Sequence, residues 1–137
     1  MSNILTTTTA AKDIAIILAA LGYGTIGTDL FVHEEPDGDQ VQDNIVSVRG
    51  TTNWKPAELA YNWEYPSVQV LVRRKAANRE VAEAYVLTLM NALQGYTGTV
   101  GGVKYHLIKV VNGPIALLSD ARGRFRFTFN CDIQRSG

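Results

Sequence analysis

Apolar residues fall on one helical face in two segments of the chain. In each segment they are spaced at i, i+4, i+7, i+8 and i+11, which is the repeat of an amphipathic helix. Gly22 and Gly95 follow as C-terminal stops, and Asn78 is placed as an N-cap for the second segment. We therefore predict helices over residues 9–21 and 78–93, with faces formed by Ala10, Ile14, Ile17, Leu18 and Leu21, and by Ala82, Val86, Leu89, Met90 and Leu93.

Alternating apolar and polar residues predict strands elsewhere. The pattern is clear over residues 68–73 and clearest over 125–133, where phenylalanines alternate with polar residues before Cys131. Two short apolar runs at 30–32 and 45–48 flank an acidic turn around Pro36. A further strand is predicted over residues 103–111. It is followed by a strong turn signal at Asn112, Gly113 and Pro114.

The order of these elements predicts the fold class. Helix, two or three strands, helix and two strands favour an α+β fold. We expect a mostly antiparallel sheet of about five strands, with two helices packed on one face. The 137 residues fit one domain, because two would each be too small to bury a core. Residues 1–137 are thus predicted to form a single domain.

Charge and the N-terminal apolar run narrow the function classes. Thirteen basic and thirteen acidic side chains cancel, so net charge does not steer the chain toward nucleic acid or an acidic membrane. The run from Ile14 to Leu21 follows Lys12 and Asp13 and is far shorter than the ~20 residues that cross a bilayer. It is predicted to be a core helix rather than a secretory signal. We expect a protein made in the cytosol, with no membrane partner.

The residues that commonly carry chemistry do not form a recognisable site. His33 and His106 have no metal-ligand spacing to each other or to the single cysteine. The acidic segment fails a calcium-loop pattern, because Val41 and Val48 stand where oxygen ligands are required. Cys131 shares the parity of the phenylalanines and is predicted to be an inert core residue. We expect no catalytic residues, no cofactor and no metal, and a protein that binds other proteins.

Three groups of side chains are candidates for a subunit or partner interface. One is an acidic loop over residues 34–43, and the second is a basic stripe formed by Arg73, Arg74, Arg124 and Arg126. The third is an aromatic connection over residues 54–65. The aromatic connection either completes the core over a sheet edge or anchors an interface, because Trp and Tyr are enriched in binding hot spots. The candidates are Glu34, Glu35, Asp37, Asp39, Trp54, Trp63, Arg73, Arg74, Arg124 and Arg126.

Several segments together resemble a known family. These are the first helix ending at Leu21 and Gly22, the strand 68–73 followed directly by the helix 78–93, and the closing strand 123–130. This layout is similar to the small tail terminator, or minor capsid, proteins of long-tailed bacteriophages. The likeness covers most of the chain, but the aromatic segment has no counterpart in it.

The resemblance implies a homohexameric ring in the virion tail or neck. Such a ring caps the completed tail tube, ends its polymerisation and presents the surface that joins the DNA-filled head. The implied partners are other copies of the chain, the tail tube protein and a head-completion or stopper protein. DNA passes through the lumen without specific binding, and no cofactor is implied.

Charge pattern suggests how such a ring is held. The acidic loop and the basic stripe at Arg73, Arg74, Arg124 and Arg126 are predicted to pair between neighbours, or with tube and head proteins. One alternative is another head–tail joining protein, such as a stopper. The other is a nucleic-acid-binding module that uses the Arg73, Arg124 and Arg126 stripe, although the phenylalanines that would stack bases lie on the opposite parity of the strand.

Overall fold

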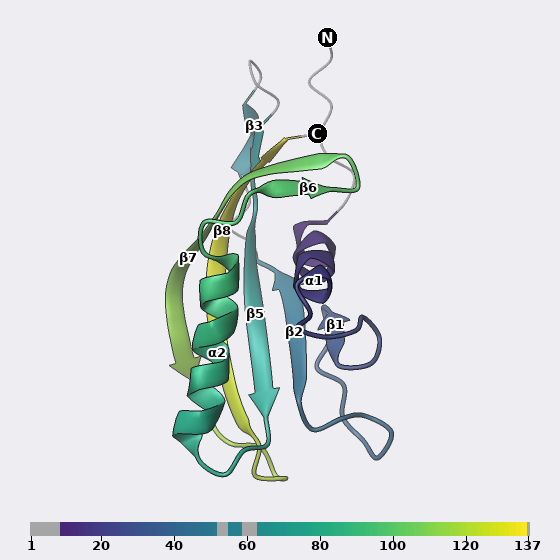
Figure 1. The fold of residues 1–137 in the computed structure, drawn as a ribbon, viewed down its shortest axis with the longest axis vertical. Coiled ribbons are helices and arrows are strands. Elements are labelled where there is room, and N and C mark those ends of the chain that lie inside the picture. The colour runs from purple at the N-terminus through teal and green to yellow at the C-terminus, as the bar shows by residue number, and fades with distance from the viewer. Residues whose placement is uncertain (1–8, 52–54, 59–62, 137) are drawn as a thin grey trace.

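A computed structural model describes residues 9–51, 55–58 and 63–136 (Figure 1). Within these ranges the chain forms two helices and eight strands. The helices are α1 (Ala10–Ala20) and α2 (Arg79–Leu93). The strands are β1 (Leu30–Val32), β2 (Ile45–Gly50), β3 (Lys55–Glu58), β4 (Trp63–Tyr65), β5 (Ser67–Arg74), β6 (Gly98–Val100), β7 (Val103–Ala116) and β8 (Phe125–Ser136).

Both helices begin at side chains that cap their free amides. The Thr9 hydroxyl accepts a hydrogen bond from the Lys12 amide at 3.2 Å, and the Asn78 side chain accepts one from the Val81 amide at 3.0 Å. These bonds satisfy donors that have no partner within the helix. The predicted helices and the Asn78 cap are confirmed. Gly95 has a φ of 78° after the end of α2, a conformation that favours glycine.

Strand β8 lies at the centre of the sheet. Its residue Asp132 pairs with Ser67 of β5 and with Lys109 of β7, so these strands lie on opposite sides of β8. Strand β4 continues the β5 side, and β3 pairs with β4. Further out on the β5 side, β2 pairs with β5, and β1 runs parallel to β2 at that margin.

The prediction of a mostly antiparallel sheet with about five strands is wrong. The sheet is mixed, because β1 and β2 are parallel, and eight of its strands lie in the described residues. Strands β3, β4 and β6 have only three or four residues each, too few to show an alternating pattern. The strand direction was missed because residues 33–44 cross the sheet instead of forming a hairpin between β1 and β2.

One face of the sheet carries both helices, as predicted. Figure 1 shows α1 over the β1–β2 side and α2 over the β7–β8 side, in agreement with the contacts of each helix. Directly paired residues of an antiparallel sheet share a face, and the pairs Val48–Val70 and Val70–Phe129 lie under the helices. These three side chains are fully buried in one core with residues of both helices.

The opposite face is partly covered by the acidic loop, residues 33–44. Ser47 lies on this face, is buried, and donates a hydrogen bond from its hydroxyl to the Glu34 carbonyl oxygen. Leu71 and Thr128 are neighbouring residues on the same face and are also buried. Contacts between the acidic loop and the sheet therefore shield this part of the helix-free face from solvent. Neither helix in the described ranges is long and apolar enough to cross a membrane.

Candidate functional site

Arg73 is the buried centre of the acidic loop. Its side chain points away from the helices, because its neighbour Val72 points toward them, and its exposure is 1%. The guanidinium donates to three backbone carbonyls, those of Asp43 (3.0 Å), Pro36 (2.8 Å) and Gln42 (2.9 Å). These residues come from both ends of the loop, so one arginine joins its two ends and satisfies three carbonyl acceptors.

Two arginines of the β8 region bind the acids of the same loop. Arg124, exposed by 1%, donates to two loop acids, Asp37 at 3.0 Å and Asp43 at 3.3 Å, and also to Asp120 in the turn before β8 at 2.7 Å. Arg126 donates from Nε and Nη2 to the two oxygens of Glu35, at 2.9 and 2.6 Å. Such a two-point arginine–carboxylate contact is both strong and directional.

The hydrogen bonds shift the pKa values of the paired groups. Burial raises the pKa of Asp120, but hydrogen bonds from the Arg124 side chain and from the Arg124 and Arg122 amides outweigh this and lower it to about 2. The Gly38 amide and the Arg124 side chain lower the pKa of Asp37. The hydrogen bond to Glu35 raises the pKa of Arg126. These directions favour the charged forms of the acids and of Arg126 near neutral pH.

The predicted complementarity of the acidic loop and the basic stripe is therefore made within one chain. Arg73 and Arg124 are buried and bound to loop groups of their own chain. Pairing of the acidic loop and the basic stripe between neighbouring subunits stays a prediction. Sequence shows that the charges are complementary, but it does not give the distance that decides between pairing inside one chain and pairing between two.

The remaining charged candidates lie elsewhere. Arg74 points to the helix face, where its guanidinium lies 3.8 Å from the centre of the Tyr85 ring. Glu34 is exposed. The Asp39 side chain is 98% exposed and lies 3.5 Å from Arg122, whose own side chain is 43% exposed. Among the loop acids that form ion pairs, Asp39 is therefore the one that its own chain neutralises least.

Of the two tryptophans among the predicted interface residues, Trp63 is half-buried in β4. Its ring stacks on His106 with centroids 4.1 Å apart and an angle of 11° between the planes. His106 Nε2 lies 2.7 Å from the Ser136 hydroxyl, so Trp63 covers the junction of β4, β7 and β8. This arrangement supports the core-completing alternative for Trp63. Trp54 lies outside the described residues.

A second buried polar cluster was not predicted. Arg135 of β8 lies 3.2 Å from a Glu64 oxygen of β4 and 3.5 Å from an Asp13 oxygen of α1. The Tyr105 hydroxyl donates to Asp13, and Arg135 donates to that hydroxyl at 3.2 Å. All four residues are at most 3% exposed. The available signal was parity, because Asp13 falls on the apolar face of α1 and Arg135 shares the parity of Phe129.

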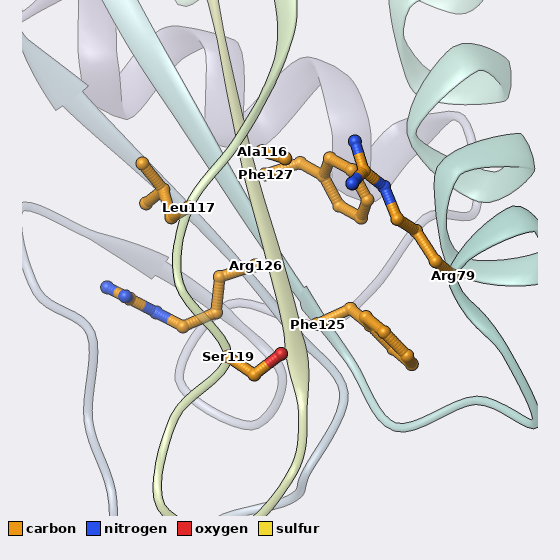
Figure 2. A pocket seen from close by; sticks show the side chains of 7 residues that line it. All are labelled: Arg79, Ala116, Leu117, Ser119, Phe125, Arg126 and Phe127. Carbon is orange, nitrogen blue, oxygen red and sulfur yellow. The ribbon is translucent and has the colours of Figure 1, made fainter.

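A cleft of about 210 Å³ lies where β7 ends, beside the start of α2. In Figure 2, Arg79, Phe125 and Phe127 lie on one side of β8, and Leu117, Arg126 and Ser119 lie on the other. The Arg79 guanidinium is 5.8 Å from the centre of the Phe127 ring. The full lining is Arg79, Ala116, Leu117, Ser119, Phe125, Arg126 and Phe127.

The remaining titratable candidates form no chemical centre. Cys131 is fully buried, and burial raises the pKa of its thiol to about 12. His33 and Glu34 are exposed on the acidic loop. Across residues 9–51, 55–58 and 63–136, no three His, Cys, Asp or Glu side chains are grouped so that they could hold a metal ion.

Comparison with known proteins gives one family and one fold. Residues 17–136 match the model of a family described as bacteriophage tail terminator protein. A chain of a solved particle, described as "Virion of native gene transfer agent (GTA) particle", has a TM-score of 0.63 at 15% identity. The match covers 90% of this chain and 86% of that one, so the two share a fold over most of their lengths. No curated protein matches the sequence.

Proposed function

Because this chain belongs to the bacteriophage tail terminator family, we propose that it caps the completed tail tube, ends tube polymerisation and forms the head–tail joining interface. The observation that carries this proposal is the extent of the family match. It spans residues 17–136 and therefore the last turn of α1, all of α2 and every described strand. The chain is thus a structural component of a phage-type virion. Within that virion we assign it the role of capping the tail tube.

We further propose that the protein acts as a homohexameric ring through which DNA passes. Its partners are then the tail tube protein below and a head-completion or stopper protein above. A closed ring requires a heterologous contact, in which one patch meets a different patch of the neighbour. The sheet supports such a contact, because its two margins are different: β1 with the acidic loop on one side, and β7 with the cleft on the other.

The structure disfavours a nucleic-acid-binding module. Arg73 and Arg124 are 1% exposed, and Arg126 is bound at two points by Glu35. Binding to a phosphate backbone requires cationic side chains that are free to contact the phosphates. These three arginines are instead bound to groups of their own chain. We expect negligible binding of duplex DNA at physiological salt by fluorescence anisotropy. Tight binding that weakens steeply as salt is added would favour the alternative.

The capping role is tested in a phage that lacks this protein. Electron microscopy should show tail tubes of irregular, extended length that are not joined to filled heads. The wild-type protein supplied in trans should restore one tail length and the joining. Tails of normal, uniform length beside unjoined heads would instead indicate a stopper or neck protein. Normal joined particles would contradict both roles.

A further inference from the structure

The arginines of the helix-free face and Arg79 at the start of α2 differ in how they are neutralised. On the helix-free face, Arg73, Arg124 and Arg126 are bound by the acidic loop and Asp120. On the helix side, Arg79 at the start of α2 is exposed, and no carboxylate of the described residues lies within ion-pair distance of it. Its described contact is the Phe127 ring. The Arg79 cleft therefore has an unneutralised cation at its rim.

The chain segment beside this cleft is unusually apolar for a surface. Leu118 is 89% exposed, Ile115 47% and Leu117 37%. Single exposed apolar residues are common on soluble proteins. Here several follow one another along the chain and continue into the apolar walls of the cleft at Phe125 and Phe127. An apolar surface with a charge at its rim is typical of a protein–protein interface, and it does not suit a phosphate backbone.

The complementary charge is on the same molecule. Asp39, at the tip of the acidic loop, has a side chain that is 98% exposed and only a 3.5 Å contact to the half-exposed Arg122. Such an exposed pair contributes little and is easily exchanged. Figure 1 shows the loop between β1 and β2 and the start of α2 at the same end of the molecule, on its opposite sides.

We propose that the acidic loop tip of one subunit docks in the Arg79 cleft of the next, with Asp39 facing Arg79. This inference rests on the ring proposed above and names its contact. A second copy is the occupant because one chain carries both complementary halves at the same end and on opposite margins. That is the arrangement that a closed heterologous contact needs. Val41, two residues beyond Asp39, is the half-buried apolar side chain that the cleft walls receive.

A charge exchange tests this contact. The variants are Arg79→Glu, Asp39→Arg, the double variant with both changes, and Lys104→Glu as a matched control on an exposed residue near the opposite end of β7. Assembly is followed by sedimentation velocity and negative-stain electron microscopy. Each protein is examined alone and with tail tubes purified from particles that lack it. Circular dichroism confirms that every variant is folded.

We expect each single variant to need at least about tenfold more protein for half-assembly, because like charges then meet across the contact. The double variant should recover wild-type assembly to within about threefold, because the pair is restored with reversed signs. Lys104→Glu should assemble as the wild type does. If the wild type forms rings only on tube ends, the same order of variants is expected there.

Each other outcome separates the contact from the proposed function. Rings in both single variants that still bind tube ends would overturn the contact and leave the ring intact. Rings in the single variants that fail only on tube ends would assign the cleft to a tube or head protein. Loss in the single variants without recovery in the double variant would overturn the Asp39–Arg79 pairing. A wild type that neither forms rings nor binds tube ends would overturn the proposed function itself.

Discussion

Arg126 binds Glu35 across 91 positions of sequence, through two hydrogen bonds of 2.6 and 2.9 Å. The same carboxylate lies 3.7 Å from the buried guanidinium of Arg73. Glu35 therefore neutralises two arginines of neighbouring strands and fixes the base of the acidic loop on the sheet. Without that carboxylate, two cations would lie side by side in a largely closed site.

Replacing Glu35→Gln keeps the shape of the side chain and removes its charge. We expect the free energy of unfolding to fall by about 1–3 kcal/mol, because both arginines lose their shared counter-charge. Urea denaturation measures the difference. Glu34→Gln is the matched control, since its side chain is exposed, and it should change stability by no more than about 0.5 kcal/mol. Equal effects of the two variants would contradict this role of Glu35.

Replacing Arg73→Met removes the donors for the three loop carbonyls. We expect a loss of about 3–5 kcal/mol, since a buried charged partner is deleted and its acceptors are left unpaired. Hydrogen exchange should show faster exchange within residues 36–43 than elsewhere in the sheet. Arg74→Met provides the comparison, because Arg74 contributes mainly a cation–π contact with Tyr85. It should cost about 1 kcal/mol and leave loop exchange unchanged.

Sequence predicted those parts of the fold that depend on local periodicity. The helical faces and the β5 and β8 alternation give direct signals, because burial repeats every 3.6 residues in a helix and every second residue in a strand. The parallel β1–β2 pair gave no such signal. Its direction is set by the crossing of residues 33–44, which Arg73 and Glu35 hold through contacts more than 30 positions away in sequence.

The candidate site was predicted in part for the same reason. The charges of Asp37 and Arg124 were recognised as complementary, but their 3.0 Å separation depends on the tertiary fold. The Asp13–Arg135 pair shows the opposite case, in which parity places both polar side chains on apolar faces. A polar residue on such a face indicates a buried partner, and each of these two is the partner of the other.

The buried polar cluster at the upper end of the sheet should be energetically coupled. Tyr105→Phe removes a hydroxyl that donates to Asp13 and accepts from Arg135, and we expect a loss of about 1–3 kcal/mol. In a double-mutant cycle with Asp13→Asn, the combined loss should be smaller than the sum of the single losses by about 0.5 kcal/mol or more. Strict additivity would show that the hydroxyl and the carboxylate do not act together.

Cys131 should resist modification until the protein unfolds. Its side chain is fully buried, and burial raises the pKa of its thiol to about 12, so the reactive thiolate is scarce at neutral pH. We expect negligible reaction with a thiol reagent in buffer and one reactive thiol per chain in strong denaturant. An exposed cysteine introduced by Ser119→Cys serves as a positive control in the folded protein. Rapid native labelling of Cys131 would contradict its core position.

Asp120 should contribute a pH-dependent part of stability. Its pKa in the fold is about 2, compared with an ordinary value of 3.8. A lowered carboxyl pKa stabilises the fold above the ordinary value, and the contribution is lost as the pH falls toward the folded value. The shift corresponds to at most about 2.5 kcal/mol. The 21% exposure of the side chain screens it to about 1 kcal/mol.

We therefore expect Asp120→Asn to be less stable than the wild type at neutral pH, with a difference that narrows between about pH 4 and pH 2. Urea denaturation at a series of pH values measures both curves. Asp39→Asn is the control, because its carboxylate is 98% exposed and should show no comparable narrowing. A constant difference between Asp120→Asn and the wild type would mean that Asp120 acts through its shape and neutral hydrogen bonds. A narrowing difference would mean that the charge of Asp120, paired with Arg124, stabilises the turn before β8.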